Sequence, residues 1–224
     1  AAPINWAVIN GEKTTGVTTF MIDEGMDTGR IMYRNVCQIG PEDTAGDVHD
    51  RLMELGAKLV CLTVDSIIEN NVEFRIQKSF IQGSEILKPA PKITKELCHI
   101  CWNDSVKQIH DLVRGLSPYP GAFTELVKDG KATQMKIFRT LKIEGEEYRK
   151  MLAQNNIAEA VPGTILSDGK TYLAIAASDG AVSVTELQLA GKKRMQAKDF
   201  LIGFRDPQDY ATSEGTSSQV TGRQ

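Results

Sequence analysis

An apolar run near the N-terminus ends in a loop that is rich in groups able to bind or react. Residues 17–22 are apolar or β-branched, which predicts a buried strand. The loop that follows, residues 23–29, carries three acids, Asp23, Glu24 and Asp27, and two glycines. Open α/β sheets keep their ligands at such loops, because main-chain groups at the carboxyl end of a strand lack ladder partners. The alternative is a hairpin turn whose acids are only solvated.

Three consecutive cations in the second half form the other candidate. Lys192, Lys193 and Arg194 follow a glycine where a loop is predicted to lead into a helix. Such a triplet can bind successive phosphates of an RNA backbone through a salt-sensitive attraction that does not depend on base sequence. Triplets of this kind also occur on ordinary solvated surfaces, so the pattern alone leaves both interpretations open.

The sequence does not favour a metal site. Cys98 and Cys101 have CxxC spacing, but one pair without a second is a weak zinc signal. Residues 97–102 are predicted to be a strand, on which the two thiols would point to opposite faces. His49 and His110 lie within helical patterns among charged residues. We therefore expect no metal.

The elements that position the acidic loop are predicted to form an α/β layer. They are a helix over 3–10, strands over about 15–22 and 30–38, and a long amphipathic helix that begins after the N-cap Thr44 and ends at Asn70. We expect these elements to be the last pieces of an α/β domain, residues 1–76, whose earlier strands lie upstream.

A linker and a second domain are predicted to follow. Residues 77–95 lose the periodicity and read as a linker, and residues 96–206 form the second domain. Its predicted elements are strands over 97–102, 122–127, 133–140, 163–166, 172–176 and 182–187, with helices from Asp104 or Ser105 to Arg114 and over 196–202. Short strands at this spacing indicate a small barrel. Residues 207–224 are expected to be a disordered tail.

Composition excludes little beyond the membrane and secreted classes. The chain has 224 residues, 41% of them hydrophobic, and a net charge of −3. Residues 1–90 hold 8 basic and 13 acidic residues, and residues 91–224 hold 18 and 16, so the second half is the better candidate for an anionic partner. No run is long enough to span a bilayer, the start is unlike a signal peptide, and the four cysteines suit reduced thiols. We expect a cytoplasmic location.

Several segments resemble the folate-dependent formyltransferases. Ala1–Ile4, Thr15–Thr18 and Asp23–Gly29 are similar to consecutive blocks of that family. Leu187–Met195 resembles the Pro-Ala-Gly-Lys-Lys-x-Met segment of the members that act on methionyl-tRNA, with Leu189 where Pro is usual. The resemblance implies the C-terminal part of a Rossmann-like catalytic domain followed by an OB-like barrel. It also implies formyl transfer from 10-formyltetrahydrofolate to methionyl initiator tRNA.

The resemblance assigns roles to the candidate residues. In the family, the Asp before Thr-Gly acts beside an Asn and a His, which implies that Asp27 orients the His and a proton-accepting water. Acyl transfer to an amine needs such a base and also donors for the tetrahedral oxyanion. The alternative is that Asp27 only accepts backbone hydrogen bonds within its turn. The implied wall of the pterin pocket is Ile22, Asp23, Glu24, Gly25 and Met26, and the implied tRNA contacts are Lys192, Lys193 and Arg194.

Some of these expectations carry open alternatives. The side chains of Asp23 and Glu24 either contact the ligand directly or are simply solvated acids of the loop, and the sequence favours neither alternative. No Asn-x-His segment precedes Ala1, so we expect a fragment that does not turn over by itself, and we expect a monomer. A sugar-nucleotide N-formyltransferase would share the Asp-Thr-Gly loop and a similar barrel. A non-catalytic RNA-binding protein would need only the barrel.

Overall fold

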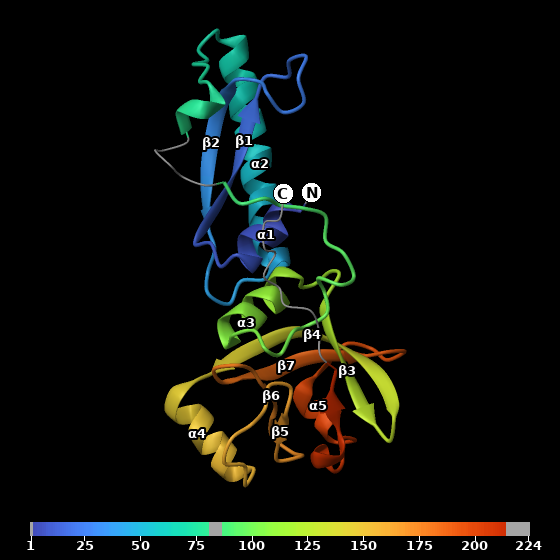
Figure 1. The fold of residues 1–224 in the computed structure, drawn as a ribbon. Coiled ribbons are helices and arrows are strands. Elements are labelled where there is room, and N and C mark those ends of the chain that lie inside the picture. Colours follow the sequence, from blue (N-terminus) through green and yellow to red (C-terminus); the bar gives the residue numbers. More distant parts are fainter. Residues whose placement is uncertain (1, 81–86, 214–224) are drawn as a thin grey trace.

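A two-stranded antiparallel sheet carries the Asp27 loop in this computed structural model, which describes residues 2–80 and 87–213. β1 (Thr14–Phe20) pairs with β2 (Ile31–Gln38), and the long helix α2 (Ala45–Ile68) packs against the pair (Figure 1). The short helix α1 (Pro3–Ile9) packs at the end of the pair remote from the Asp27 loop. The small core between them consists of Val8, Cys37, Ile39, Ala45, Val48 and Leu52. These elements lie where the sequence predicts them.

Thr44 and Asp47 define the start of α2. The Thr44 hydroxyl accepts a hydrogen bond from the Asp47 N–H at 3.1 Å, and the Asp47 carboxylate accepts one from the Thr44 N–H at 2.9 Å. The pair satisfies donors that the first helical turn leaves without partners, an effect worth about 1 kcal/mol. The prediction of a long helix after Thr44 is confirmed.

One face of α2 is apolar and exposed. Met53, Val60 and Ile68 lie on it, whereas Val48 and Leu59 are buried against the strands. A helix that is apolar on two faces is typical of a layer packed between two others. The described residues show a mixed α/β arrangement, and the further strands expected for the domain remain a prediction.

The second part is a seven-stranded antiparallel sheet that curves around its own core (Figure 1). Its strands are β3 (Ala122–Lys128), β4 (Lys131–Ile143), β5 (Ile165–Ser167), β6 (Leu173–Ala176), β7 (Ala181–Leu189), β8 (Met195–Gln196) and β9 (Ala211–Thr212). The order is β5-β6-β7-β4-β3-β9, and β8 pairs with β7. The five later strands predicted from the sequence are therefore confirmed as β3 to β7.

Helices close this sheet. α3 (Val106–Gly115) begins after a capping box formed by Ser105 and Gln108, and it packs on β4 between the two parts of the molecule. α5 (Ala197–Leu201) lies against β7. The remaining elements are α4 (Gly145–Gln154) and two short 3₁₀ turns, η1 (Gln77–Phe80) and η2 (Pro207–Asp209). The Ser105 cap and the short helix after 196 agree with the sequence.

The prediction of a strand over 97–102 was wrong. These residues form a turn that meets β3 only around Phe123, where Ile100 N–H donates to the Phe123 carbonyl at 2.8 Å. A second turn follows at once, with Asp104 N–H donating to the Cys101 carbonyl at 3.1 Å, because the chain must bend into the α3 cap. Cys98 and Cys101 are both buried, and Cys98 belongs to the main core of the second part.

The sequence interpretation also missed α4. Gly145, with φ of +58°, turns the chain out of β4, and Tyr148, Met151 and Leu152 then pack on the sheet at helical spacing. Two acids in the first turn favour this start, since they complement the helix dipole.

Part of the tail is ordered, contrary to the expectation of disorder from 207 onward. Ala211 and Thr212 pair with Val127 and Leu126 of β3, and the Tyr210 ring lies 4.5 Å from that of Phe204. The start of the predicted tail therefore extends the sheet beyond β3. Residues 214–224 lie outside the described residues, as do residues 81–86 of the predicted linker.

The buried side chain of Arg114 joins the two parts. Its Nε donates to Asp111 at 2.7 Å, and its Nη1 donates to the carbonyls of Gly40 and Asp43 at 3.4 and 3.1 Å. Arg51 also pairs with Asp43 and holds the pKa of that carboxyl below its ordinary value. Charge-assisted bonds of this kind are directional, so the network fixes the loop after β2 against α3.

Candidate active site

Residues 21–30 form a closed loop between β1 and β2. Met21 N–H donates to the Arg30 carbonyl at 3.0 Å, which closes the loop at its base. A Cβ at Gly29 would overlap the carbonyl of Met21, so the close approach of the two arms requires glycine. Asp27 has φ of +56°, in the left-handed region, and is exposed.

Asp23 and Asp27 have different surroundings. The Asp23 carboxylate accepts hydrogen bonds from Gly25 N–H at 3.1 Å and from the Thr28 hydroxyl at 2.5 Å, so it holds the loop in shape. The Asp27 carboxylate accepts no hydrogen bond from the residues that the structure describes. The alternative that Asp27 only caps its own turn is therefore wrong, because Asp23 does so.

The proposed pterin wall is exposed and apolar at its two ends. The side chains of Ile22 and Met26 are 89% and 91% exposed. Between them, Glu24 has no hydrogen-bond partner among the described residues, while Gly25 lies against Thr28. Uncovered apolar side chains next to unpaired main-chain groups suit a flat, partly polar ring.

One contact reaches this loop from a distant part of the sequence. The side-chain amide of Gln77, in η1, donates to the main-chain carbonyls of Asp27 at 2.6 Å and Gly29 at 2.9 Å. The sequence analysis missed this residue, because no pattern relates a glutamine in an aperiodic segment to a loop 50 residues earlier.

The structure divides the basic triplet. Arg194 donates from Nε and Nη2 to the two carboxylate oxygens of Glu186, at 2.6 Å each, and its guanidinium lies 4.2 Å from the Phe138 ring centroid. Lys192 and Lys193 are exposed, and their ammonium groups have no partner among the described residues. The two lysines are therefore free to bind an anion, whereas Arg194 is held by the sheet.

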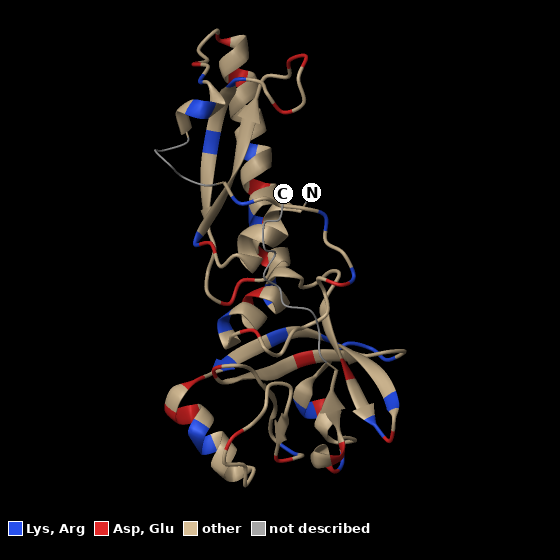
Figure 2. Cartoon of the chain, in the orientation of Figure 1, with Lys and Arg blue, Asp and Glu red and all other residues tan. Residues whose placement is uncertain are grey.

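The two candidate segments are not brought together. Figure 2 shows acidic residues, in red, on the loop between β1 and β2, and basic residues, in blue, on the turn after β7, in the other part of the molecule. A ligand that contacted both would have to be a macromolecule.

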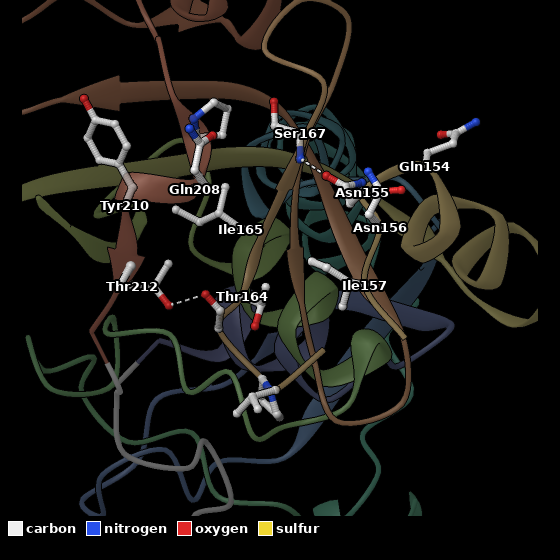
Figure 3. Close-up of a pocket in the computed structure, with 15 residues that line it drawn as sticks. Gln154, Asn155, Asn156, Ile157, Thr164, Ile165, Ser167, Gln208, Tyr210 and Thr212 are labelled. Carbon is white, nitrogen blue, oxygen red and sulfur yellow. Dashed lines mark hydrogen bonds between the residues drawn. The ribbon is translucent and has the colours of Figure 1, made fainter. Parts of the chain in front are cut away.

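A cavity of about 640 Å³ lies away from both segments (Figure 3). It is lined by the loop after α4, by β5 and by the C-terminal segment, including Asn155, Ser167, Gln208, Tyr210 and Thr212. Asn155 and Thr212 are engaged in the fold, through bonds to Ser167 N–H at 3.1 Å and to the Gly163 carbonyl at 2.8 Å. The cavity has no charged lining residue, and the sequence analysis did not single it out.

Residues 2–80 and 87–213 hold neither a candidate metal site nor a helix that could span a membrane. No group of three or more His, Cys, Asp and Glu side chains there could hold a metal ion. None of the helices in that part of the chain has both the length and the apolar character needed to cross a bilayer.

Two family models match the chain. The model for the formyl transferase C-terminal domain matches residues 92–205, and the model for formyl transferase matches residues 1–64. The chain belongs to the formyl transferase family. Within this family assignment, the Asp27 loop falls in the first matched region and Lys192 to Arg194 fall in the second.

Curated relatives match most of this chain at nearly half of the aligned positions. Methionyl-tRNA formyltransferase of Parabacteroides distasonis is 46% identical over 211 residues, which cover 94% of this chain and 62% of the relative. The enzyme of the same name from Phocaeicola vulgatus is 48% identical over 206 residues, covering 92% and 60%. The chain thus spans about three fifths of the length of the curated relatives it matches.

Solved structures share the fold of this chain. HypX from Aquifex aeolicus in complex with tetrahydrofolic acid matches with a TM-score of 0.61 at 18% identity, over 90% of this chain and 32% of that one. An N-formyltransferase from Helicobacter canadensis, in complex with folinic acid and dTDP-3-aminofucose, matches with a TM-score of 0.55 at 20% identity, over 87% and 61%. At these identities the likeness shows the fold alone.

Proposed function

We propose that this chain takes part in the transfer of a formyl group from 10-formyltetrahydrofolate to the amino group of methionyl initiator tRNA, in translation initiation. The observation that carries the proposal is the identity of 46–48% to methionyl-tRNA formyltransferases, which extends over both parts of the chain. The carboxylate of Asp27 and the ammonium groups of Lys192 and Lys193, none of which has a partner among the described residues, are the groups that this reaction would use.

Asp27 is the residue proposed to act on the amine. In the reaction the amine attacks the formyl carbon and a tetrahedral oxyanion forms. The amine then gives up a proton, the bond to the folate nitrogen breaks, and that nitrogen takes up a proton as tetrahydrofolate leaves. A carboxylate that is unpaired within the described chain can take up that proton through a water or orient a neighbouring base. Asp27 is exposed, so its carboxylate is accessible to a bound substrate.

The exposed wall from Ile22 to Met26 is proposed to bind the pterin ring of the folate. Ile22 and Met26 supply apolar surface, and unpaired main-chain groups between them can bond the ring edge. The donor brings the formyl group, and this loop holds the donor beside Asp27. The Asp23 carboxylate maintains the loop rather than contacting the ring, since both of its hydrogen bonds lie within the loop.

The curved sheet is proposed to be an OB-like barrel that binds the tRNA backbone. Lys192 and Lys193 extend from the turn after β7, and ammonium groups without protein partners attract phosphates. Arg194 contributes by holding the turn against Phe138 and Glu186. Initiator tRNA is large enough to reach the separate Asp27 loop at the same time.

The proposed function is tested by assaying the complete gene product, as its genome encodes it, with 10-formyltetrahydrofolate and methionyl initiator tRNA. The expected result is formyl-methionyl-tRNA, with elongator methionyl-tRNA and amino sugar nucleotides as competing acceptors that react much more slowly. Faster formylation of an amino sugar nucleotide would overturn the proposal. So would tRNA binding that is independent of folate and unaccompanied by any transfer.

A further inference from the structure

We propose that Gln77 is a positioning residue for Asp27, and that it holds the reactive loop from a separate segment of the chain. The effect that this residue should have on catalysis rests on the proposed function. The structural part of the proposal, that one amide fixes the loop, can be tested independently of that function.

The Gln77 amide uses both of its N–H groups on one turn. Nε2 donates to the carbonyl of Asp27 at 2.6 Å and to the carbonyl of Gly29 at 2.9 Å. The two acceptors flank Thr28, so the orientations of the peptide planes after Asp27 and after Gly29 are both set by a single side chain. In the described chain, Gln77 is the one residue outside 21–30 that hydrogen-bonds to residues 22–29.

The segment that carries Gln77 is itself attached to the sheet. Arg75 and Ile31 exchange two main-chain hydrogen bonds of 2.8 and 2.9 Å, which bring residues near η1 alongside the start of β2. Gln77 lies two residues further on and is half-buried. The amide therefore acts from a fixed frame rather than from a second free loop.

The loop needs such a contact, because Asp27 has an unfavourable backbone conformation. A non-glycine residue with φ of +56° costs on the order of 1 kcal/mol, and it persists only where surrounding bonds determine it. A hydrogen bond from Gln77 to the Asp27 carbonyl offsets a cost of this size. Without Gln77, the Met21–Arg30 bond and the Asp23 contacts would hold only the base and one side of the loop.

The consequence for catalysis is one of position rather than of chemistry. Gln77 bonds only main-chain atoms of the loop, so it supplies no proton and takes none. A displacement of about 1 Å in a catalytic group can lower a rate by about a hundredfold. Loss of the Gln77 amide should therefore lower kcat while leaving substrate affinity almost unchanged.

The structural test is backbone ¹⁵N relaxation in the 224-residue chain. Gln77→Met keeps the length of the side chain and removes both donors, and Gln77→Glu replaces the amide with an isosteric carboxylate that repels the carbonyls. The expected result is a fall in the order parameters of Asp27 and Thr28 from about 0.85 to below about 0.6 in both variants. Gln154→Met, in α4, is the matched control and should change nothing at the loop. Unchanged order parameters in both Gln77 variants would overturn the proposal.

The kinetic test uses the complete gene product. In the Gln77→Met and Gln77→Glu variants, kcat should fall by about ten- to a hundredfold, with KM for tRNA and for folate within about twofold. A raised KM with unchanged kcat would contradict positioning and indicate a substrate contact. If the unmutated gene product shows no formyl transfer, the proposed function fails, and the relaxation measurement still decides whether Gln77 holds the loop.

Discussion

Arg194 and Glu186 form a two-bond ion pair across β7 and the turn that follows it. Nε and Nη2 of the arginine each lie 2.6 Å from a carboxylate oxygen, and the geometry leaves the two preceding lysines as the free cations of the triplet. Adjacent residues of the same charge therefore have different expected roles, and substitution can separate them.

Replacing Lys192 and Lys193 together with Ala should weaken binding of tRNA by the 224-residue chain about tenfold. Each lost phosphate contact should also reduce the slope of log K against log salt concentration by about 1. Filter binding at four salt concentrations measures both. Lys150→Ala is the control, since that lysine pairs with Glu146 on the exposed side of α4. An unchanged salt slope would show that the lysines do not contact phosphate.

Replacing Arg194 with Ala should act mainly on stability. It removes the pair with Glu186 and the contact with the Phe138 ring, and the free energy of unfolding should fall by about 1 kcal/mol. Denaturation by urea, with Glu186→Gln as a second variant, measures the loss. An equal loss of stability for Lys193→Ala would contradict the expectation that, within the basic triplet, Arg194 stabilises the fold and the lysines do not.

His110 should make stability depend on pH near neutrality. It is buried between the Thr140 hydroxyl at 3.0 Å and the Pro41 carbonyl at 3.3 Å, and burial lowers the pKa of its ring. Two nearby charges have smaller effects: the Glu42 carboxylate raises that pKa and the Lys142 ammonium lowers it. The folded state therefore binds the proton less readily than the unfolded state does.

The sign follows from this difference. The stabilisation is complete above the unfolded pKa of about 6.5, and it is lost as the pH falls below that value, with a slope of at most about 1.4 kcal/mol per pH unit. Urea denaturation between pH 7.5 and 5.5 should show the slope in the wild type and a weaker one in His110→Gln. His49→Gln, at an exposed site, should keep the full slope. Identical slopes for all three proteins would refute the prediction.

Gly29→Ala should disrupt the Asp27 loop without affecting the curved sheet of the second part. The added methyl group would overlap the Met21 carbonyl, so the loop must open, at a cost of about 2 kcal/mol. Amide spectra should show shifts confined to the β1–β2 hairpin and η1. The matched control is Gly203→Ala, where the nearest heavy atom to the added Cβ is 3.9 Å away. Shifts of equal size in both variants would contradict the predicted overlap between the added methyl group at residue 29 and the Met21 carbonyl.

Local signals in the sequence predicted much of the scaffold. The Thr44 and Ser105 caps, the two strands around the Asp27 loop and the later strands all depend on residues a few positions apart, and the structure has them. The α4 helix was also encoded locally, by Tyr148, Met151 and Leu152, and could have been found. The strand expected over 97–102 failed because the neighbouring cap at Ser105 forces a turn.

Contacts between distant residues could not be predicted in this way. Gln77 meets the Asp27 loop only because Arg75 bridges to β2, and Arg194 meets Glu186 only through the pairing of β7 with β8. Neither contact follows from a regular spacing of residues that can be recognised in a single sequence. The candidate residues were thus found from their types, whereas their division into binding, holding and positioning roles required the structure.

The most direct test of the account is the Asp27→Asn variant of the complete gene product in a formylation assay. Asn tolerates the left-handed backbone that Asp27 adopts, so the loop should be preserved while the carboxylate is lost. Asp129→Asn is the matched control, since Asp129 also has a positive φ, of +50°, in the turn between β3 and β4. The account predicts that Asp27→Asn lowers kcat by about 10²- to 10⁴-fold and leaves tRNA affinity within about twofold. A kcat within a few-fold of the wild type would contradict it.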